Sequence, residues 1–394
     1  MNLIFYIISI PFIFYLIFPG TIILLSLFRK IKMNKKYGDN TSIAFIITAY
    51  KKLSLAQYCV DSILKQKEKN YHIYLVADAC KDSLHLTSKY LSILRPESDL
   101  NSKVRSMKFA FDRLHKNHTH VCVLDPDNLI KSNFTEEIKY FIQCGYNVVQ
   151  GRRTAKNTDS IFAKLDVLGE SYYNYLARYC MFKLGSSASI AGSGMVLTVG
   201  LFKNYFGSKI IKEKFNQIIL GEDKILQNYL VSKGEQIAFS RDAIIYDEKL
   251  NSGSQAERQR TRWINTYFQN IKESLNMLFN SVVRLNWNSF LFSIMSISPP
   301  LFLLLFISIL LFSISILIDQ KFAIFLFILI FIFISNFFLI WKLAKVPNKV
   351  ISSFWLIPLF LFKQFKALLS IGKSKNDFLT TSSSKAISID NVRE

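Results

Sequence analysis

The feature that most limits what this chain can fold into is a set of long uncharged stretches on either side of a polar middle. Leu3 to Phe28 carry no charge over 26 residues, and further uncharged runs extend from Leu285 to Ile318 and from Phe322 to Trp341. An α-helix of 26 residues is about 39 Å long, which is enough to span a bilayer with some tilt. The pattern therefore predicts transmembrane helices that flank a polar domain.

Composition and charge support a membrane protein whose polar domain faces the cytoplasm. The chain is 51% hydrophobic, contains 35 Phe and carries a formal net charge of +21. Five basic residues follow the first uncharged run, and such clusters favour the cytoplasmic side; they are Arg29, Lys30, Lys32, Lys35 and Lys36. The first run lacks the basic start and cleavage site of a signal peptide, so residues 1–28 are predicted to remain as a transmembrane helix. Nucleic acid is not predicted as a partner, because no nucleic-acid motif is present.

The carboxyl-terminal part is predicted to contain three kinds of segment. Residues 285–345 are expected to form two transmembrane helices joined at Asp319-Gln320-Lys321. Residues 346–372 include only 13 consecutive apolar residues, which is short for a span and better suits an interfacial or re-entrant helix. Residues 373–394 are rich in Ser and Thr and are expected to be a flexible cytosolic tail. Three spans without repeat halves or polar intramembrane residues argue against a transporter.

The polar middle, residues 29–284, has the pattern of a single α/β domain. Strand-like and helix-like segments alternate, which predicts a parallel sheet whose strands end at one edge. A later strand is expected to run into a basic turn at Arg152-Arg153, and a helix with several packed tyrosines is expected to follow. The expected strands are 42–47, 71–76, 121–124, 148–151 and 236–246, and the expected helices are 55–66, 102–115, 161–182 and 224–230.

Carboxylates follow two of these strands. Asp78 ends the second strand, and Asp125 and Asp127 follow the strand Val121–Leu124. In open α/β folds, ligands bind at the carboxyl ends of the strands. An Asp-x-Asp pair there can hold a divalent cation through oxygen ligands, and the cation can hold a diphosphate. Taken alone, the motif is more typical of a strand followed by an acidic turn, because Asp and Asn are common turn formers.

Two further segments carry chemistry. Asp223 precedes a short amphipathic helix, where it could be a helix cap or a general base. Gln259, Arg262 and Trp263 share one face of a later helix, at positions i, i+3 and i+4. An amide, a guanidinium and an indole on one face suit a sugar diphosphate, because Arg binds phosphate oxygens and Trp stacks on a sugar.

The cysteines and histidines indicate neither a disulfide framework nor a zinc site. The chain has five cysteines, an odd number, and no C-x-x-C pair. This favours reduced thiols in the cytosol. His115, His118 and His120 lie close together in sequence, but no carboxylate stands at ligand spacing, so a metal site there is not favoured.

With these segments identified, the chain resembles the family 2 glycosyltransferases, specifically the membrane-embedded branch of the cellulose, hyaluronan and chitin synthases. The resemblance covers residues 3 to 345, and Gln-x-x-Arg-Trp is its sharpest block. Its carriers are Ile46-Ile47-Thr48-Ala49-Tyr50, Asp78, Asp125-Pro126-Asp127-Asn128, Gly221-Glu222-Asp223 and Gln259-Arg260-Thr261-Arg262-Trp263.

The resemblance implies a GT-A domain inserted between transmembrane α-helices and an inverting transfer from a nucleotide-sugar, with Mg²⁺ or Mn²⁺ as cofactor. It implies that Asp223 is the general base and Asp127 the metal ligand. Substrate binding would fall to Ala49, Tyr50, Asp78, Lys103, Asp125, Gln259, Arg262 and Trp263.

The leading hypothesis is a membrane glycosyltransferase of the cell (inner or plasma) membrane, multi-pass, with a cytoplasmic catalytic domain. Its partners would be a nucleotide-sugar donor, a glycan or lipid-linked acceptor and the lipid bilayer, and its role would be in cell-surface polysaccharide synthesis. The alternative is a non-catalytic, membrane-anchored subunit that binds nucleotide-sugars or acts as a scaffold. Lys51-Lys52, where the family usually has Asn-Glu, would suit that alternative.

Overall fold

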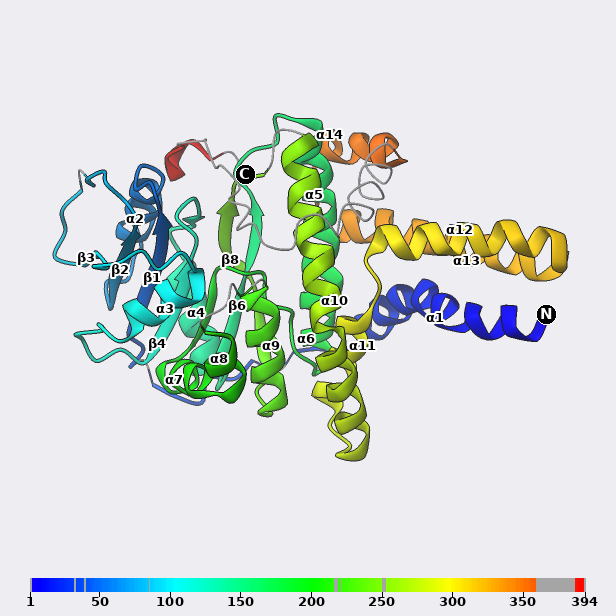
Figure 1. Cartoon of the computed structure of the whole chain (residues 1–394), viewed down its shortest axis with the longest axis horizontal. Helices are drawn as coiled ribbons and strands as arrows, with labels where there is room; N and C mark the ends of the chain where they lie inside the picture. Colours follow the sequence, from blue (N-terminus) through cyan, green and yellow to red (C-terminus); the bar gives the residue numbers. More distant parts are fainter. Residues whose placement is uncertain are drawn as a thin grey trace. The chain divides into compact units, whose positions relative to one another are not determined.

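The computed structural model of the chain describes residues 2–31, 33–38, 40–84, 86–215, 219, 221–249, 253–358 and 387–392 (Figure 1). Its residues group into two compact units. The helical unit contains residues 1–31, 160–186 and 250–377, and the sheet unit contains residues 32–159, 187–249 and 378–394. The predicted domain 29–284 contributes residues to both units.

The sheet unit is built on one mixed sheet of eight strands in the order β3-β2-β1-β4-β7-β6-β8-β5. Strands β1 to β4 run parallel to one another, β7 is antiparallel to β4 and β6, and β6 and β8 are parallel. The strands are β1 (Ile43–Tyr50), β2 (Tyr71–Asp78), β3 (Leu91–Leu94), β4 (His120–Leu124), β5 (Leu129–Ile130), β6 (Val148–Ala155), β7 (Met195–Thr198) and β8 (Ile237–Asp247).

These directions bring several strand ends to one side of the sheet. Strand β6 has the direction of β4, because β7 is antiparallel to both, and β8 has the direction of β6. The carboxyl ends of β1, β2, β4 and β8 therefore share one edge, which we call the carboxyl edge. Strands β2 and β4 are buried along their whole length, as expected of apolar runs covered on both faces.

Helices cover the sheet within this unit. They are α2 (Ala56–Leu64), α3 (Lys103–Phe111), α4 (Phe134–Gln143), α7 (Val199–Gly207), α8 (Lys209–Lys214) and α9 (Glu222–Ser232). The predicted strands and helices are present, although β3, β5 and β7 were not predicted. The predicted basic turn at Arg152-Arg153 is wrong: both residues lie inside β6, which continues past a register shift at Gly151/Arg152 and stays paired with β8.

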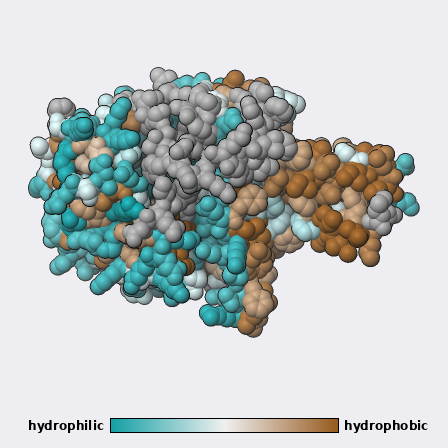
Figure 2. All heavy atoms as spheres, viewed as in Figure 1, coloured by the Kyte–Doolittle hydropathy of each residue, from teal (hydrophilic) through white to brown (hydrophobic). Residues whose placement is uncertain are grey.

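The helical unit contains three helices that are long and apolar enough to cross a membrane, at Leu3–Leu27, Leu301–Ile318 and Gln320–Leu343. Helices α12 and α13 run side by side, and brown, hydrophobic side chains cover them (Figures 1 and 2). The elements are α1 (Asn2–Leu27), α5 (Ile161–Tyr173), the π-helix η1 (Asn174–Cys180), α6 (Met181–Lys183), α10 (Gly253–Val283), α11 (Trp287–Ile297), α12 (Leu301–Ile318), α13 (Gln320–Leu343), α14 (Asn348–Ile351) and η2 (Ser352–Leu356).

The core of the helical unit joins segments that are far apart in sequence. Phe18 of α1, Tyr172 of α5, Leu176 of η1 and Ile340 of α13 belong to one buried cluster. The tyrosines predicted to pack do so, because Tyr172 and Tyr175 are buried in this cluster. The ring of Tyr172 stacks on Phe337 with centroids 4.5 Å apart.

The uncharged run 285–318 does not form one long helix. It divides into α11 and α12 at Ser298-Pro299-Pro300. A helix that ends before prolines leaves carbonyl groups without partners in the helix. Two tyrosines satisfy two of them: the Tyr15 hydroxyl donates to the Ile294 carbonyl at 3.0 Å, and the Tyr267 hydroxyl donates to the Ile297 carbonyl at 2.8 Å.

Part of the predicted flexible tail is packed. Residues 387–392 contain the short 3₁₀ helix η4 (Ile389–Asn391), and Ile389 and Val392 contact a buried cluster of Leu129, Ile244 and Tyr246 in the sheet unit. This differs from a tail that is flexible throughout. Most of residues 373–394, and residues 359–372 of the predicted interfacial segment, lie outside the described residues.

Candidate functional site

The turn after β4 occupies the carboxyl edge and is organised by a buried amide. Asn128 is 0% exposed. Its Oδ1 accepts from the Asp125 amide at 3.0 Å and from the Ser193 hydroxyl at 2.5 Å. Its Nδ2 donates to Asp127 Oδ1 at 3.3 Å and to Asp247 Oδ1 at 3.2 Å. One side chain thus fixes the turn and links the ends of β4 and β8.

A second cluster is centred on Lys103, the first residue of α3. Its Nζ lies 2.6 Å from Asp125 Oδ1 and 3.3 Å from Glu222 Oε1, and it donates to the Gly192 carbonyl at 2.9 Å. The side chains of Lys103 and Glu222 are only about one-fifth exposed. Lys103 therefore joins three segments that are separate in sequence.

Burial and charge act in opposite senses on this pair. Burial alone would lower the pKa of Lys103, but the carboxylates of Asp125 and Glu222 reverse that effect and raise the pKa well above its ordinary value. Burial raises the pKa of Glu222, and the positive charge of Lys103 offsets only part of that rise. Lys103 is consequently held as a cation next to an acid that is easier to protonate than a solvent-exposed glutamate.

Asp223, the predicted general base, lies in the first turn of α9 beside this cluster. Gly221 precedes the helix in a left-handed conformation with φ of 74°. Asp223 Oδ1 accepts from the Lys224 amide at 2.9 Å. A Cβ added at Gly192 would lie 3.8 Å from Asp223 Oδ2, so the glycine loop passes directly beside this carboxylate. The structure therefore gathers Lys103, Asp125 and Asp223 around one loop.

The glycine loop between residues 191 and 195 has little tolerance for side chains. A Cβ at Gly194 would lie 2.4 Å from Ile245 Cδ1. Gly192 and Gly194 both have positive φ, 86° and 66°, which favours glycine. The loop packs closely against Ile245 of β8, and its backbone passes beside Lys103 and Asp223.

Several charged residues of this edge were not predicted as site residues. Lys156 donates to the Asp127 carbonyl at 3.0 Å and lies 3.3 Å from Glu248 Oε2. Lys249 lies 3.2 Å from Asp247 Oδ2. The acids could have been found by applying to β8 the reasoning applied to β4, since Asp247-Glu248 closes a strand with the same direction. No sequence signal distinguishes Lys156 and Lys249 from the many other lysines.

Asp78 also lies at this edge, at the end of β2 and paired in register with Tyr50. Its two carboxylate oxygens accept from the Leu100 amide at 2.8 Å and the Asn101 amide at 2.9 Å. The Tyr50 hydroxyl donates to Asn101 Oδ1 at 2.7 Å, and Ala49 is buried beside it in β1. Asp78 therefore holds the 100–101 loop, and any ligand would share oxygens that already accept hydrogen bonds.

The block Gln259-Arg260-Thr261-Arg262-Trp263 lies on α10 in the helical unit. Trp263 is 37% exposed, and the Arg260 guanidinium carbon lies 4.2 Å from the centre of its ring. Arg260 Nη2 also donates to Asp166 Oδ1 at 2.5 Å. Gln259 and Arg262 are partly exposed, and neither forms a side-chain hydrogen bond or ion pair within the described part of the chain.

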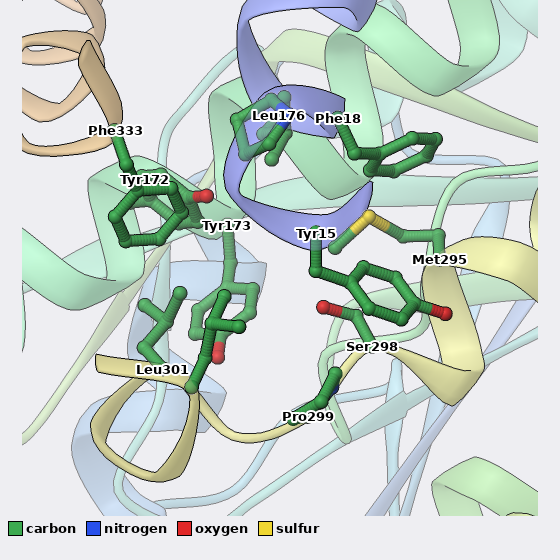
Figure 3. A pocket seen from close by; sticks show the side chains of 12 residues that line it. Tyr15, Phe18, Tyr172, Tyr173, Leu176, Met295, Ser298, Pro299, Leu301 and Phe333 are labelled. Carbon is green, nitrogen blue, oxygen red and sulfur yellow. The ribbon is translucent and has the colours of Figure 1, made fainter. Parts of the chain in front are cut away.

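A small aromatic cavity lies within the helical unit, near the Ser298-Pro299 break (Figure 3). Tyr15, Tyr172 and Tyr173 point into it, together with Met295. Its volume is about 40 Å³. A water molecule takes up about 30 Å³ in the liquid, so the cavity is too small for a sugar ring or a lipid tail. It does not identify an acceptor.

The carboxyl edge supplies suitable donors for a hard divalent cation, but not a complete cage. Asp125 and Asp127 offer carboxylate oxygens, which Mg²⁺ and Mn²⁺ prefer. Across the described residues, no group of three or more His, Cys, Asp or Glu side chains could hold a metal alone. The pair fits a cation whose remaining ligands come from a diphosphate and water, as is usual for Mg²⁺.

All five cysteines are free and buried. Burial raises the pKa of the Cys80 thiol to about 11, so this thiol is not poised as a nucleophile.

Comparison with known proteins assigns this architecture to a family. The curated Glycosyltransferase GlyA of Streptococcus pneumoniae is 21% identical over 255 residues, which is 60% of this chain and 35% of that protein. The chain thus spans about a third of the length of this relative. The solved mannosyltransferase PcManGT from Pyrobaculum calidifontis, in complex with GDP-Man and Mn²⁺, is 12% identical and superimposes with a TM-score of 0.56 over 93% of this chain and 97% of that chain.

A structure of S. aureus TarS 1–349 in complex with UDP-GlcNAc is less similar, with 13% identity and a TM-score of 0.39 over 60% of this chain and 67% of that chain. The mixed α/β sheet is that of a GT-A-like glycosyltransferase, which confirms the predicted fold class. Residues 40–266, more than half of the chain, match the family described as "Glycosyltransferase like family 2". The chain therefore belongs to the glycosyltransferase-like family 2.

Proposed function

We propose that this protein is a membrane-bound, inverting glycosyltransferase of the cellulose, hyaluronan and chitin synthase-like branch. It moves a sugar from a nucleotide-sugar, in our proposal a UDP-sugar, to a glycan or lipid-linked acceptor in cell-surface polysaccharide synthesis. The single observation that carries the proposal is the cluster of Asp125, Lys103 and Asp223 around the glycine loop at the carboxyl edge. A candidate base lies there beside groups suited to a diphosphate.

The proposed chemistry assigns a separate task to each group. Asp223 accepts the proton of the acceptor hydroxyl, whose oxygen forms a bond to the anomeric carbon while the bond to the diphosphate breaks. Attack from the face opposite the leaving group inverts the anomeric centre. Asp127, with Asp125, would hold a divalent cation that neutralises charge on the leaving diphosphate. Lys103 is a positive group suited to the same charge.

Lys103 also has a second task in this scheme, because it compensates Asp125 and Glu222 before a ligand binds. Without that cation, the buried carboxylates would repel both one another and a diphosphate. The complex of PcManGT with GDP-Man and Mn²⁺ supports the same classes of ligand for this chain, a nucleotide-sugar and a divalent cation. The base and the sugar of the donor remain to be identified by experiment.

The three apolar helices support a multi-pass protein of the cell membrane. Five basic residues follow α1, and they would place residues 29–284 on the cytoplasmic side, where nucleotide-sugars are made. In this arrangement residues 1–28 and 285–345 anchor the enzyme in the membrane.

The test is donor turnover by the purified protein. A panel of UDP- and GDP-sugars is incubated with the protein and Mn²⁺ or Mg²⁺, and release of the nucleoside diphosphate is measured. Asp127→Ala and Asp223→Asn are each expected to abolish transfer while the protein remains folded in the membrane. Asp112→Asn, which alters an exposed ion pair on α3, is the matched control and should retain activity.

Full activity in Asp127→Ala or Asp223→Asn would refute the site assignment. Metal-dependent nucleotide binding without turnover of any donor would instead favour the non-catalytic binding subunit. Product length then separates a processive synthase from an enzyme that adds one sugar.

A further inference from the structure

Trp263 is held by a residue that the sequence pattern Gln-x-x-Arg-Trp does not specify. Arg260 lies three residues before Trp263 on α10, so the two side chains share a face of the helix. The guanidinium carbon is 4.2 Å from the centre of the indole ring. At that distance the flat cation stacks on the face of the ring.

The same guanidinium is fixed at its other end. Arg260 Nη2 donates to Asp166 Oδ1 at 2.5 Å, and Asp166 belongs to α5. The side chains of Arg260 and Asp166 are only 16% and 13% exposed. A planar guanidinium can bind a carboxylate through its edge while its face stacks on an aromatic ring, which a lysine cannot do.

We infer that Arg260 is a positioning residue that fixes the indole plane of Trp263 for an acceptor sugar. The inference rests on the proposed glycosyltransferase function, and it takes Trp263 as the residue on which the acceptor sugar stacks, as the sequence pattern suggests. Asp166 anchors Arg260, Arg260 covers one side of the indole, and the partly exposed remainder of Trp263 is presented in a single orientation. Loss of that orientation weakens acceptor binding, because stacking of a sugar on an indole depends on the plane of the ring.

The helical unit contains a matched pair for comparison. Arg178 Nη1 donates to Glu170 Oε1 at 2.9 Å, and Glu170 lies one turn after Asp166 on α5. This pair is also buried, with side chains 7% and 8% exposed. It has the same chemistry as the Arg260–Asp166 pair, whereas the guanidinium over the Trp263 ring is that of Arg260.

The experiment compares Arg260→Lys and Asp166→Asn with Arg178→Lys in the full-length protein. Acceptor KM is expected to rise on the order of tenfold in the first two variants, while donor hydrolysis without acceptor is unchanged. Arg178→Lys should leave both quantities near their wild-type values. The donor is the one identified by the turnover screen, and oligosaccharides of the same sugar serve as acceptor.

A second measurement is independent of activity. The four tryptophans are replaced by 5-fluorotryptophan, and the ¹⁹F resonance of Trp263 is assigned with Trp263→Phe. Arg260→Lys should shift and broaden that resonance, whereas Arg178→Lys should not. An unchanged Trp263 resonance in Arg260→Lys, or equal changes in the two arginine variants, would overturn the inference.

The two readouts also separate this inference from the proposed function. If the protein is no transferase, the wild type and Asp127→Ala release the same background of nucleoside diphosphate. The ¹⁹F spectrum still reports whether Arg260 holds Trp263. A held Trp263 with no effect on acceptor KM in an active enzyme would show that the fixed indole plane does not serve the acceptor.

Discussion

The two edges of the sheet differ in how their ionisable side chains are paired. At the carboxyl edge, Asp125 and Glu222 are compensated by Lys103. At the other end of β2 and β4, two histidines are buried and a third is half-buried, and the described contacts give none of them a carboxylate partner. They bond to neutral hydroxyls: His72 to Ser92, His118 to Ser42 and Tyr74, and His120 to Thr119.

The difference indicates that one edge of the sheet is suited to binding a charged ligand, while the side chains at the other edge only stabilise the fold. A charged edge with paired signs can exchange an internal partner for a charged ligand, because its carboxylates and cations are already partly desolvated. Burial lowers the pKa of His72, His118 and His120 to about 4, so these rings are neutral at pH 7.

The largest effect is expected from removing the cation of the carboxyl edge. Lys103→Met should lower donor turnover by roughly 100-fold and destabilise the protein by about 2–4 kcal/mol, since Asp125 and Glu222 lose their partner while still largely buried. Kinetics and the thermal unfolding midpoint of the solubilised protein measure the two effects.

Lys108→Met is the control for that substitution. Lys108 lies on the same helix and pairs with Asp112, but both side chains are substantially exposed, at 34% and 46%. Its loss should change stability by no more than about 0.5 kcal/mol. Equal effects of Lys103→Met and Lys108→Met on stability would contradict the claim that the Lys103 cluster contributes more than an exposed ion pair.

Acidification should weaken the histidine end first. Below pH 6.5 the unfolded chain takes up protons that the folded histidines, with pKa values of about 4, do not bind. The contribution of these histidines to the free energy of unfolding is therefore fully present above pH 6.5 and is lost progressively toward pH 4. The total loss is roughly 2–4 kcal/mol, after allowance for partial exposure and coupling.

The carboxyl edge should respond in the opposite sense, because the pKa of Glu222 is raised in the fold and its protonation favours the folded state as the pH falls. Unfolding midpoints recorded across this pH range, in the wild type and in a variant with His72, His118 and His120 replaced by Gln, measure the histidine contribution. A wild-type slope as flat as that of the variant would show that the histidines do not control acid stability.

Removal of the amide that links β4 to β8 should have an intermediate effect. Asn128→Ala leaves the Asp125 amide and the Ser193 hydroxyl without their acceptor in a buried site, at an expected loss of about 2–3 kcal/mol. Asn133→Ala, which removes a longer, part-buried hydrogen bond at 3.4 Å to Glu137, should cost less. Hydrogen exchange of β5 and β8 would show whether the loss is local; unchanged protection in Asn128→Ala contradicts the linking role.

The smallest effect is expected where the carboxyl-terminal segment meets the sheet unit. Ile389→Ala should cost about 1 kcal/mol, because Ile389 is only partly buried against Leu129 and Tyr246. Protease susceptibility near residues 387–392 measures the change. Asn391→Ala, an exposed residue of η4 outside the apolar contact, serves for comparison. An Ile389→Ala protein as resistant as the wild type would mean that this contact contributes nothing.

The sheet and its edge were accessible from sequence because buried parallel strands are continuous apolar runs that end in acids, as at Asp78 and Asp125. Strands β5 and β7 were missed because they have two and four residues, too short for a periodic pattern. Strand β3 was missed because Ser92 interrupts its apolar run. The role of Asn128 could not be predicted, since its partners Ser193 and Asp247 are brought to it only by the antiparallel β7 and the return of β8.

The break between α11 and α12 has a consequence for the apolar helices around it. A helix terminus in oily surroundings ordinarily needs water or lipid headgroups to hydrate its bare carbonyls. Here two phenols replace that hydration, and burial keeps the Tyr267 pKa at about 12, so its proton stays available at any physiological pH. The chain thus turns between α11 and α12 with two of the freed carbonyl groups bonded to tyrosine hydroxyls instead of being left without a partner.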